Sequence, residues 1–134
     1  MALLVSLAVS SQDHKKFSPE KFEAEMEQYI TKEANLTPQE AAKLFPVLRE
    51  MHDRQRVVYA KMRQMARNKP TDEEGCVNAI KEYDKMNIEL KHLENGYHKK
   101  MLQLIPASKL FDVIKAEYRF HRRMMKGWQK GKHQ

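Results

Sequence analysis

The chain has 134 residues, of which 41% are hydrophobic and 32% are charged. This length supports one domain with a modest core, and the single cysteine excludes an intramolecular disulfide. Only 4 glycines and 5 prolines are present, so the composition favours long helices over a sheet of many short strands. The net charge is +7, and residues 107–134 carry 8 of the 25 basic residues but only 2 of the 18 acidic ones. A basic C-terminal end of this kind can attract nucleic acid, anionic lipid or acidic polypeptide.

The first segment, residues 1–11, is apolar and ends in small residues, and a polar stretch follows from Gln12. This is the shape of the apolar region and cleavage zone of a secretory signal, without the basic residues that usually precede it. We therefore expect residues 1–17 to be a residual signal peptide and linker, and the protein to be periplasmic. An N-terminal helix docked on the core is the alternative. The segment is too short to span a bilayer, which needs roughly 20 apolar residues.

The next two segments begin with clear helix-start signals. Ser18 and Pro19 predict a first helix over 19–34. Thr37 as N-cap, Pro38 at the first helical position and Glu40 three residues after the cap predict a second helix from 38 to about 68. Pro46 lies inside this second helix, where we expect a bend. The apolar stripe of the second helix consists of Ala41, Leu44, Phe45, Leu48, Met51, Val58, Met62 and Met65, interrupted by Gln55.

The third helix is expected to open at Thr71–Glu74, with a cap and acidic residues in its first turn. Its stripe is Val77, Ile80, Tyr83, Asn87, Leu90, Leu93, Tyr97, Met101 and Leu104. Pro106 ends it, and a fourth helix begins at Ala107 and frays around Gly127. The fourth helix has the stripe Leu110, Val113, Ile114, Glu117, Phe120 and Met124.

These elements predict an all-α fold: a long antiparallel helical hairpin with shorter N- and C-terminal helices. The hairpin domain covers residues 18–126, and residues 127–134 form a basic flexible tail. A short turn between two helices of about 45 Å each forces the antiparallel pairing. Because one long hairpin cannot bury both of its apolar faces, we expect a two-fold homodimer.

The segment Leu36-Thr37-Pro38-Gln39-Glu40 resembles the Leu-Thr-x-x-Gln motif of the Spy/CpxP family of periplasmic stress chaperones. Gln39 stands one residue early, and Glu40 occupies the position where that family has glutamine. The layout over about residues 18–125 is also similar to the family's, and to related periplasmic heavy-metal sensors. The resemblance implies a dimeric hairpin cradle whose basic, partly apolar concave face holds unfolded proteins without ATP.

The basic C-terminal end interleaves cations with aromatic residues, which suits a surface for acidic or unfolded polypeptide. Nucleic acid or lipid is an alternative partner, and a solvated helix end is the simplest interpretation of all. No recognised nucleic-acid motif is present, and we expect no nucleic-acid partner. The candidate contacts with a client or partner are Arg56, Arg63, Arg119, Arg122, Arg123, Met124 and Trp128.

The residues with metal-binding or catalytic potential show little of the spacing that such sites need. The six histidines contain no pair three or four residues apart, so we expect ordinary surface histidines and no metal or cofactor: His14, His52, His92, His98, His121 and His133. His121 near Met124 and Met125 is a weak set for a soft metal. Acidic residues among lysines and arginines at helical spacing indicate solvated ion pairs. We therefore expect a non-enzymatic chaperone or envelope-stress protein, with a metal or stress sensor as the alternative.

Overall fold

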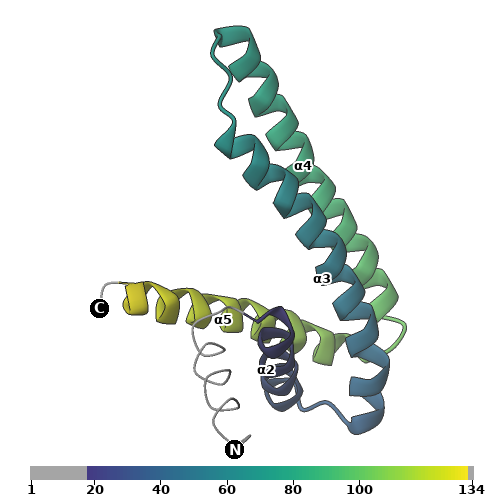
Figure 1. Ribbon diagram of the computed structural model, residues 1–134. Helices are drawn as coiled ribbons and strands as arrows, with labels where there is room; N and C mark the ends of the chain where they lie inside the picture. The colour runs from purple at the N-terminus through teal and green to yellow at the C-terminus, as the bar shows by residue number, and fades with distance from the viewer. Residues whose placement is uncertain (1–17, 133–134) are drawn as a thin grey trace, which may run out of the picture.

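The computed structural model describes residues 18–132, with side chains for residues 18–127. The expected signal peptide and linker at 1–17 lie outside this range. Within it the chain is all-helical and contains no strand, which confirms the all-α class. The helices are α2 (Pro19–Glu33), α3 (Pro38–Arg67), α4 (Glu73–Met101) and α5 (Ala107–Lys132), shown in Figure 1.

The helix ends follow the capping signals closely. The Ser18 hydroxyl accepts a hydrogen bond from the backbone N–H of Lys21 at 3.3 Å, and α2 is followed by Asn35 in the left-handed conformation, with φ of 51°. At α3, the Thr37 hydroxyl accepts from the N–H of Glu40 at 3.1 Å, and the Glu40 carboxylate accepts from the N–H of Thr37 at 2.9 Å. The expected capping box is therefore present. For α4 the N-cap is Asp72, without a side-chain capping bond.

The helices pack in two pairs, α3 with α4 and α2 with α5. Figure 1 shows α3 and α4 side by side and projecting from the rest of the molecule, with their connection at the far end. We call residues 57–92 the arm. The remaining described residues, 18–56 and 93–132, form the base. They comprise α2, α5, the start of α3 and the end of α4.

The hydrophobic core lies almost entirely in the base. There, fifteen buried residues from all four helices and their connections form one cluster. The ring of Phe120 on α5 packs edge-on against Phe22 of α2, with centroids 5.2 Å apart, and lies 5.7 Å from the ring of Tyr29. In the arm the buried cluster consists of Val58, Met62 and Leu90 only. Each of two helices that pack only on each other buries a single stripe, so the arm has few buried residues.

The prediction of a buried apolar stripe on the third helix, α4, is wrong for the first half of that helix. Leu90 is buried, as expected, but Val77, Ile80 and Tyr83 are exposed. In the arm α4 has only α3 to pack against, and Met86, half-buried, packs on the arm cluster instead. The apolar residues outside that single contact face stay in solvent, because neither α2 nor α5 reaches the arm.

The last helix is longer than its glycine content suggested. It continues past Gly127, where we expected fraying, to Lys132. Glycine in a helix costs only about 1 kcal/mol relative to alanine, which is too little to end it by itself. Pro46, where we expected a bend, lies inside α3. No helix among residues 18–132 has the length and apolar character needed to cross a membrane.

Candidate functional site

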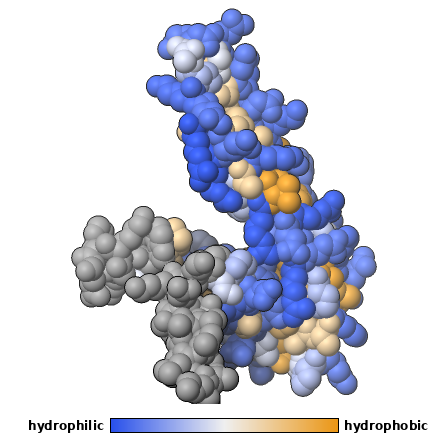
Figure 2. All heavy atoms as spheres, viewed as in Figure 1, coloured by the Kyte–Doolittle hydropathy of each residue, from blue (hydrophilic) through white to orange (hydrophobic). Residues whose placement is uncertain are grey.

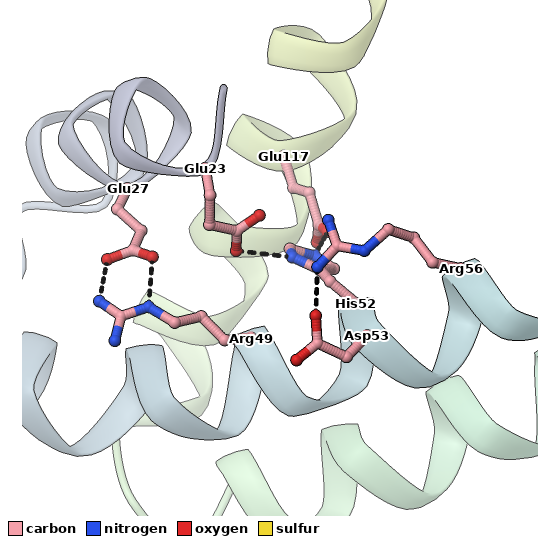
Figure 3. A network of polar contacts seen from close by, with 7 residues as sticks. All are labelled: Glu23, Glu27, Arg49, His52, Asp53, Arg56 and Glu117. Atoms are coloured by element: carbon pink, nitrogen blue, oxygen red, sulfur yellow. Dashed lines mark hydrogen bonds and ion pairs between the residues drawn. The ribbon is translucent and has the colours of Figure 1, made fainter. Parts of the chain in front are cut away.

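A buried polar centre joins three helices in the base (Figure 3). His52 of α3 is 7% exposed and lies between two glutamates. Its Nδ1 is 3.0 Å from a carboxylate oxygen of Glu23 on α2, and its Nε2 pairs with a carboxylate oxygen of Glu117 on α5. The expectation of an ordinary surface histidine is therefore wrong at position 52. The reason is that α2 and α5, which are distant in sequence, close over this part of α3.

The two contacts define the charge of the imidazole. Carboxylate oxygens accept hydrogen bonds, so both ring nitrogens of His52 must carry a proton, which makes the ring a cation. Burial by itself lowers the pKa of His52, but the hydrogen bonds to Glu117 and Glu23 and the charges of both carboxylates outweigh it and raise the pKa to about 9. At neutral pH the centre is thus an imidazolium held between two anions.

His121 lies next to this centre on α5, with its ring centroid 5.5 Å from that of Phe22. His121 is an exposed residue, but partial burial of its side chain lowers its pKa. The negative charges of Glu117 and Glu23 oppose this shift, and the cation at His52 reinforces it. The pKa values of the two histidines are therefore shifted in opposite directions, that of His52 upward and that of His121 downward.

Two further ion pairs fasten the helices of the base. The guanidinium of Arg49 on α3 donates two hydrogen bonds, of 2.7 and 2.6 Å, to the carboxylate of Glu27 on α2. The Lys109 ammonium at the start of α5 donates to the Glu40 carboxylate at 2.6 Å and to the Asn35 carbonyl at 3.0 Å. The hydrogen bond from Lys109 is the main cause of the lowered pKa of Glu40, with the backbone N–H of Thr37 second.

Residues 36–40, which resemble the Leu-Thr-x-x-Gln motif, have a structural role in this chain. Leu36 is buried in the base core, Thr37 and Glu40 form the capping box, and Pro38 begins α3. Gln39 is exposed. Through Glu40, this segment also connects the start of α3 to the start of α5.

The residues proposed for client contact occupy two separate places. Arg56 and Arg63 are exposed on α3, at the top of the base and in the arm, and Arg56 pairs with Asp53 on its own helix. Arg119, Arg122 and Arg123 are exposed on α5. The Arg123 guanidinium lies over the Tyr29 ring at 5.3 Å, and Met124 is 38% exposed. Trp128 belongs to the α5 backbone, but its side chain lies outside the described ones.

The arm and α5, which carry most of these arginines, also expose many large apolar side chains. Figure 2 shows hydrophobic groups on the arm and the base, set in an otherwise hydrophilic face. The exposed apolar residues of the arm are Val57, Tyr59, Val77, Ile80, Tyr83 and Ile88. Those of α5 are Phe111, Ile114, Tyr118, Met124 and Met125. Exposure of Met124 and Met125 agrees with expectation, whereas Ile114, like Val77, Ile80 and Tyr83, was expected on a buried stripe and is exposed.

The concave features of the described residues are shallow and open to solvent. A groove of about 350 Å³ between α2 and α3 is lined by charged residues that include Glu23, Glu27 and Arg49. These three groups already bind one another or His52. Within residues 18–132, no cluster of three or more histidine, cysteine or acidic side chains is arranged to hold a metal ion. His52 presents each ring nitrogen to a different carboxylate, so the three groups do not converge on one point.

The importance of His52 was missed because its partners are 29 and 65 residues away. One local signal was available: position 52 follows Phe45 by seven residues and Leu48 by four, which places it on the apolar side of α3. Glu117 stood in the predicted apolar stripe of the last helix. A histidine and a glutamate on two apolar stripes are candidates for a buried pair.

We compared the chain with protein-family models, with curated proteins and with solved structures, and no match was found in any of them.

Proposed function

We propose that this protein is an ATP-independent chaperone or envelope-stress protein of the periplasm, which binds unfolded or partner polypeptides. The observation that carries the proposal is the combination of exposed apolar side chains with arginines on open helical surfaces. Val57 and Tyr59 follow Arg56 by one and three residues on α3, and Tyr118 and Met124 are the sequence neighbours of Arg119 and Arg123 on α5. Contiguous exposed apolar surface rimmed by polar groups is typical of protein-binding sites.

Binding would proceed in two steps that use different parts of this surface. The positive charge of the arginines steers an acidic or unfolded chain to the surface over distances up to the Debye length, about 8 Å at physiological salt. The apolar side chains then bury part of the client's hydrophobic surface. Methionine side chains adapt to varied shapes, so Met124 and Met125 suit a client without a fixed sequence.

The proposal includes a dimer of antiparallel hairpins formed by α3 and α4. Six large apolar residues are exposed on the two helices of the arm. Exposed apolar surface of this kind often marks a protein–protein interface. A second copy packed along the arm would cover part of that surface. A stable interface of this type buries about 800 Å² per partner. Light scattering tests it directly: a clean monomer at micromolar concentration contradicts the dimer.

Suppression of aggregation tests the chaperone role. The full chain is mixed with a reduced test protein, and turbidity is followed without nucleotide. We expect suppression at equimolar ratio, and reduced suppression in the variant R56S/R63S/R119S/R122S/R123S. A matched control is K21S/K32S/K43S/K81S/K85S, which removes five exposed charges elsewhere. No effect at several-fold excess of the wild type refutes the chaperone role, and equal loss in both variants refutes the assigned surface. Stoichiometric binding of zinc, nickel or copper in calorimetry would favour the sensor instead.

A further inference from the structure

Helix α5 carries a second apolar row in addition to the one that packs into the base. The inner row, Leu110, Val113, Ala116 and Phe120, is buried. The outer row consists of Phe111, Ile114, Tyr118 and Met125. Its spacings of three, four and seven residues place these side chains on one face of the helix, over about 21 Å at 1.5 Å per residue.

The outer row is clearly in solvent. Phe111 and Tyr118 are 63% and 68% exposed, and Met125 is 58% exposed. Figure 1 shows α5 crossing the base and running away from the arm, so α3 and α4 do not cover its C-terminal half. An apolar row of this length on an otherwise packed helix needs an occupant.

A row of cations runs beside the apolar row. Lys115, Arg119, Arg122 and Lys126 follow one another at spacings of four, three and four residues, so they share one side of α5. All four side chains are exposed, and none forms an ion pair with a side chain among the described residues. Lys115 lies 5.9 Å from the centroid of the Phe111 ring, which places the two rows in contact.

The acidic residues of α5 do little to neutralise that row. Glu117 is directed into the base, where it pairs with His52 (Figure 3). Asp112, the other acid in the helix, precedes Lys115 by three residues, so it can offset one of the four cations at most. The face that α5 presents to solvent is therefore apolar along its middle and cationic along one edge.

The charge selects among the possible occupants. A second copy of α5 placed on the outer row would bring the two cationic rows close together, and like charges at that range repel. A folded acidic protein would satisfy the cations but would need a groove shaped to a straight apolar row. An anionic membrane surface offers both properties at once: a flat hydrocarbon boundary with negative headgroups directly above it.

We propose that the outward face of α5 is an interfacial membrane-binding surface, which docks parallel to a bilayer containing anionic phospholipid. Phe111, Ile114, Tyr118 and Met125 enter the boundary between headgroups and acyl chains. Lys115, Arg119, Arg122 and Lys126 remain at headgroup level, where their long side chains reach the phosphates. The helix lies on the membrane and does not cross it. This inference does not depend on the chaperone proposal, although Tyr118, Arg119, Arg122 and Met125 serve in both.

The experiment measures co-sedimentation of the full chain with lipid vesicles in the absence of any client protein. One set of vesicles is phosphatidylcholine alone, and the other contains about one-third phosphatidylglycerol. A basic residue near an anionic surface strengthens partitioning about fivefold, so we expect at least tenfold tighter binding to the anionic set. Raising the salt concentration should weaken it.

Two variants separate the contributions of the rows. K115Q/R122Q/K126Q should reduce binding to anionic vesicles at least tenfold, and F111S/Y118S/M125S should reduce it to a similar extent. Matched controls on the arm, K81Q/K85Q/K91Q and V57S/I80S/I88S, change exposed residues of the same kinds and should bind like the wild type. Circular dichroism verifies that each variant keeps its helices.

Several outcomes would overturn the assignment. Equal binding to neutral and anionic vesicles removes the role of the basic row, and equal loss in the arm controls removes the role of α5. Polyglutamate serves as a competitor that has charge but no hydrocarbon. If polyglutamate binds to α5 as tightly as the anionic vesicles and F111S/Y118S/M125S has no effect on vesicle binding, the surface recognises acidic polypeptide rather than lipid. Failure to suppress aggregation would not affect the vesicle result, so the two proposals fail separately.

Discussion

The base and the arm of this molecule are built from the same helices but are held together in different ways. In the base, four helices enclose fifteen buried residues and a charged centre that links α2, α3 and α5. In the arm, α3 and α4 continue alone and share three buried residues. The difference shows that one pair of helices can be part of a closed core at one end and an open surface at the other.

The physical reason is the number of neighbours that each helix has. A helix buries only the stripe that faces another helix, so a two-helix segment leaves apolar residues such as Val77 and Ile80 in solvent. The base is therefore the part expected to determine the global stability of the fold. The arm is free to present surface to a partner, and its own stability is expected to be local.

The largest effect should come from removing the cation at the centre of the base. His52→Ala leaves Glu23 and Glu117 facing each other with side chains only 14% and 17% exposed. Breaking a buried charged pair in this way costs about 3–5 kcal/mol. Urea unfolding at pH 6 measures the loss. His92→Ala, an exposed histidine of the arm, is the control and should change stability by less than about 0.5 kcal/mol.

A second variant identifies the source of that loss. Replacing Glu23, His52 and Glu117 together by leucine removes all three charges, so it should recover most of the stability. If His52→Ala costs less than about 1 kcal/mol, the polar centre does not hold the base together.

Truncation of apolar residues compares the two regions directly. Leu44→Ala, at a fully buried position in the base, should reduce the global free energy of unfolding by about 3–4 kcal/mol. Met62→Ala should act mainly within the arm and accelerate hydrogen exchange there, while exchange in the base stays slow. If the wild-type protein is a monomer and its arm and base are equally protected from hydrogen exchange, the arm is not less stable than the base. Equal protection would be the expected result if a second copy covers the arm.

The base should also respond to pH through His52. Its pKa is raised from the ordinary value of 6.5 to about 9, so its stabilising effect is complete below about pH 6.5 and is lost as the pH rises toward 9. The loss is at most about 3 kcal/mol. His121, whose pKa is lowered, acts in the opposite sense and reduces stability as the pH falls below about 6.5. Stability should therefore be greatest close to pH 6.5.

Urea titrations between pH 5 and 9 measure this profile, with the facing groups Glu23 and Glu117 left in place. The alkaline decline should disappear in His52→Ala and persist in His121→Ala. A wild type whose stability is constant from pH 6.5 to 9 would show that the ring of His52 is neutral at neutral pH.

The smallest effect is expected at the junction where α3 begins. Thr37→Ala removes the side-chain cap of Glu40 N–H and should cost about 1 kcal/mol. Gln39→Ala, at an exposed neighbouring position, is the control and should have almost no effect. Thermal unfolding followed by circular dichroism distinguishes the two. A larger loss from Gln39 than from Thr37 would assign the motif-like segment a role other than capping.

The local features of the fold could be predicted from the sequence because they depend on residues close together in the chain. Ser18, Thr37 and Pro38 placed the starts of α2 and α3, and Pro106 separated the last two helices. Buried residues such as Leu44, Met51 and Leu110 were on the expected stripes. The proposed client contacts, Arg119 and Arg122 among them, stay predictions, since exposure alone does not identify a partner.

The all-α class, the helix starts and most of the base core were thus contained in the sequence, because capping and helical periodicity act over three or four residues. Only the tertiary structure decided that α2 packs on α5 and that His52 is buried between Glu23 and Glu117. It also decided that the apolar stripe of α4 is exposed in the first half of that helix. These features depend on which helices meet in space, and no local pattern records that.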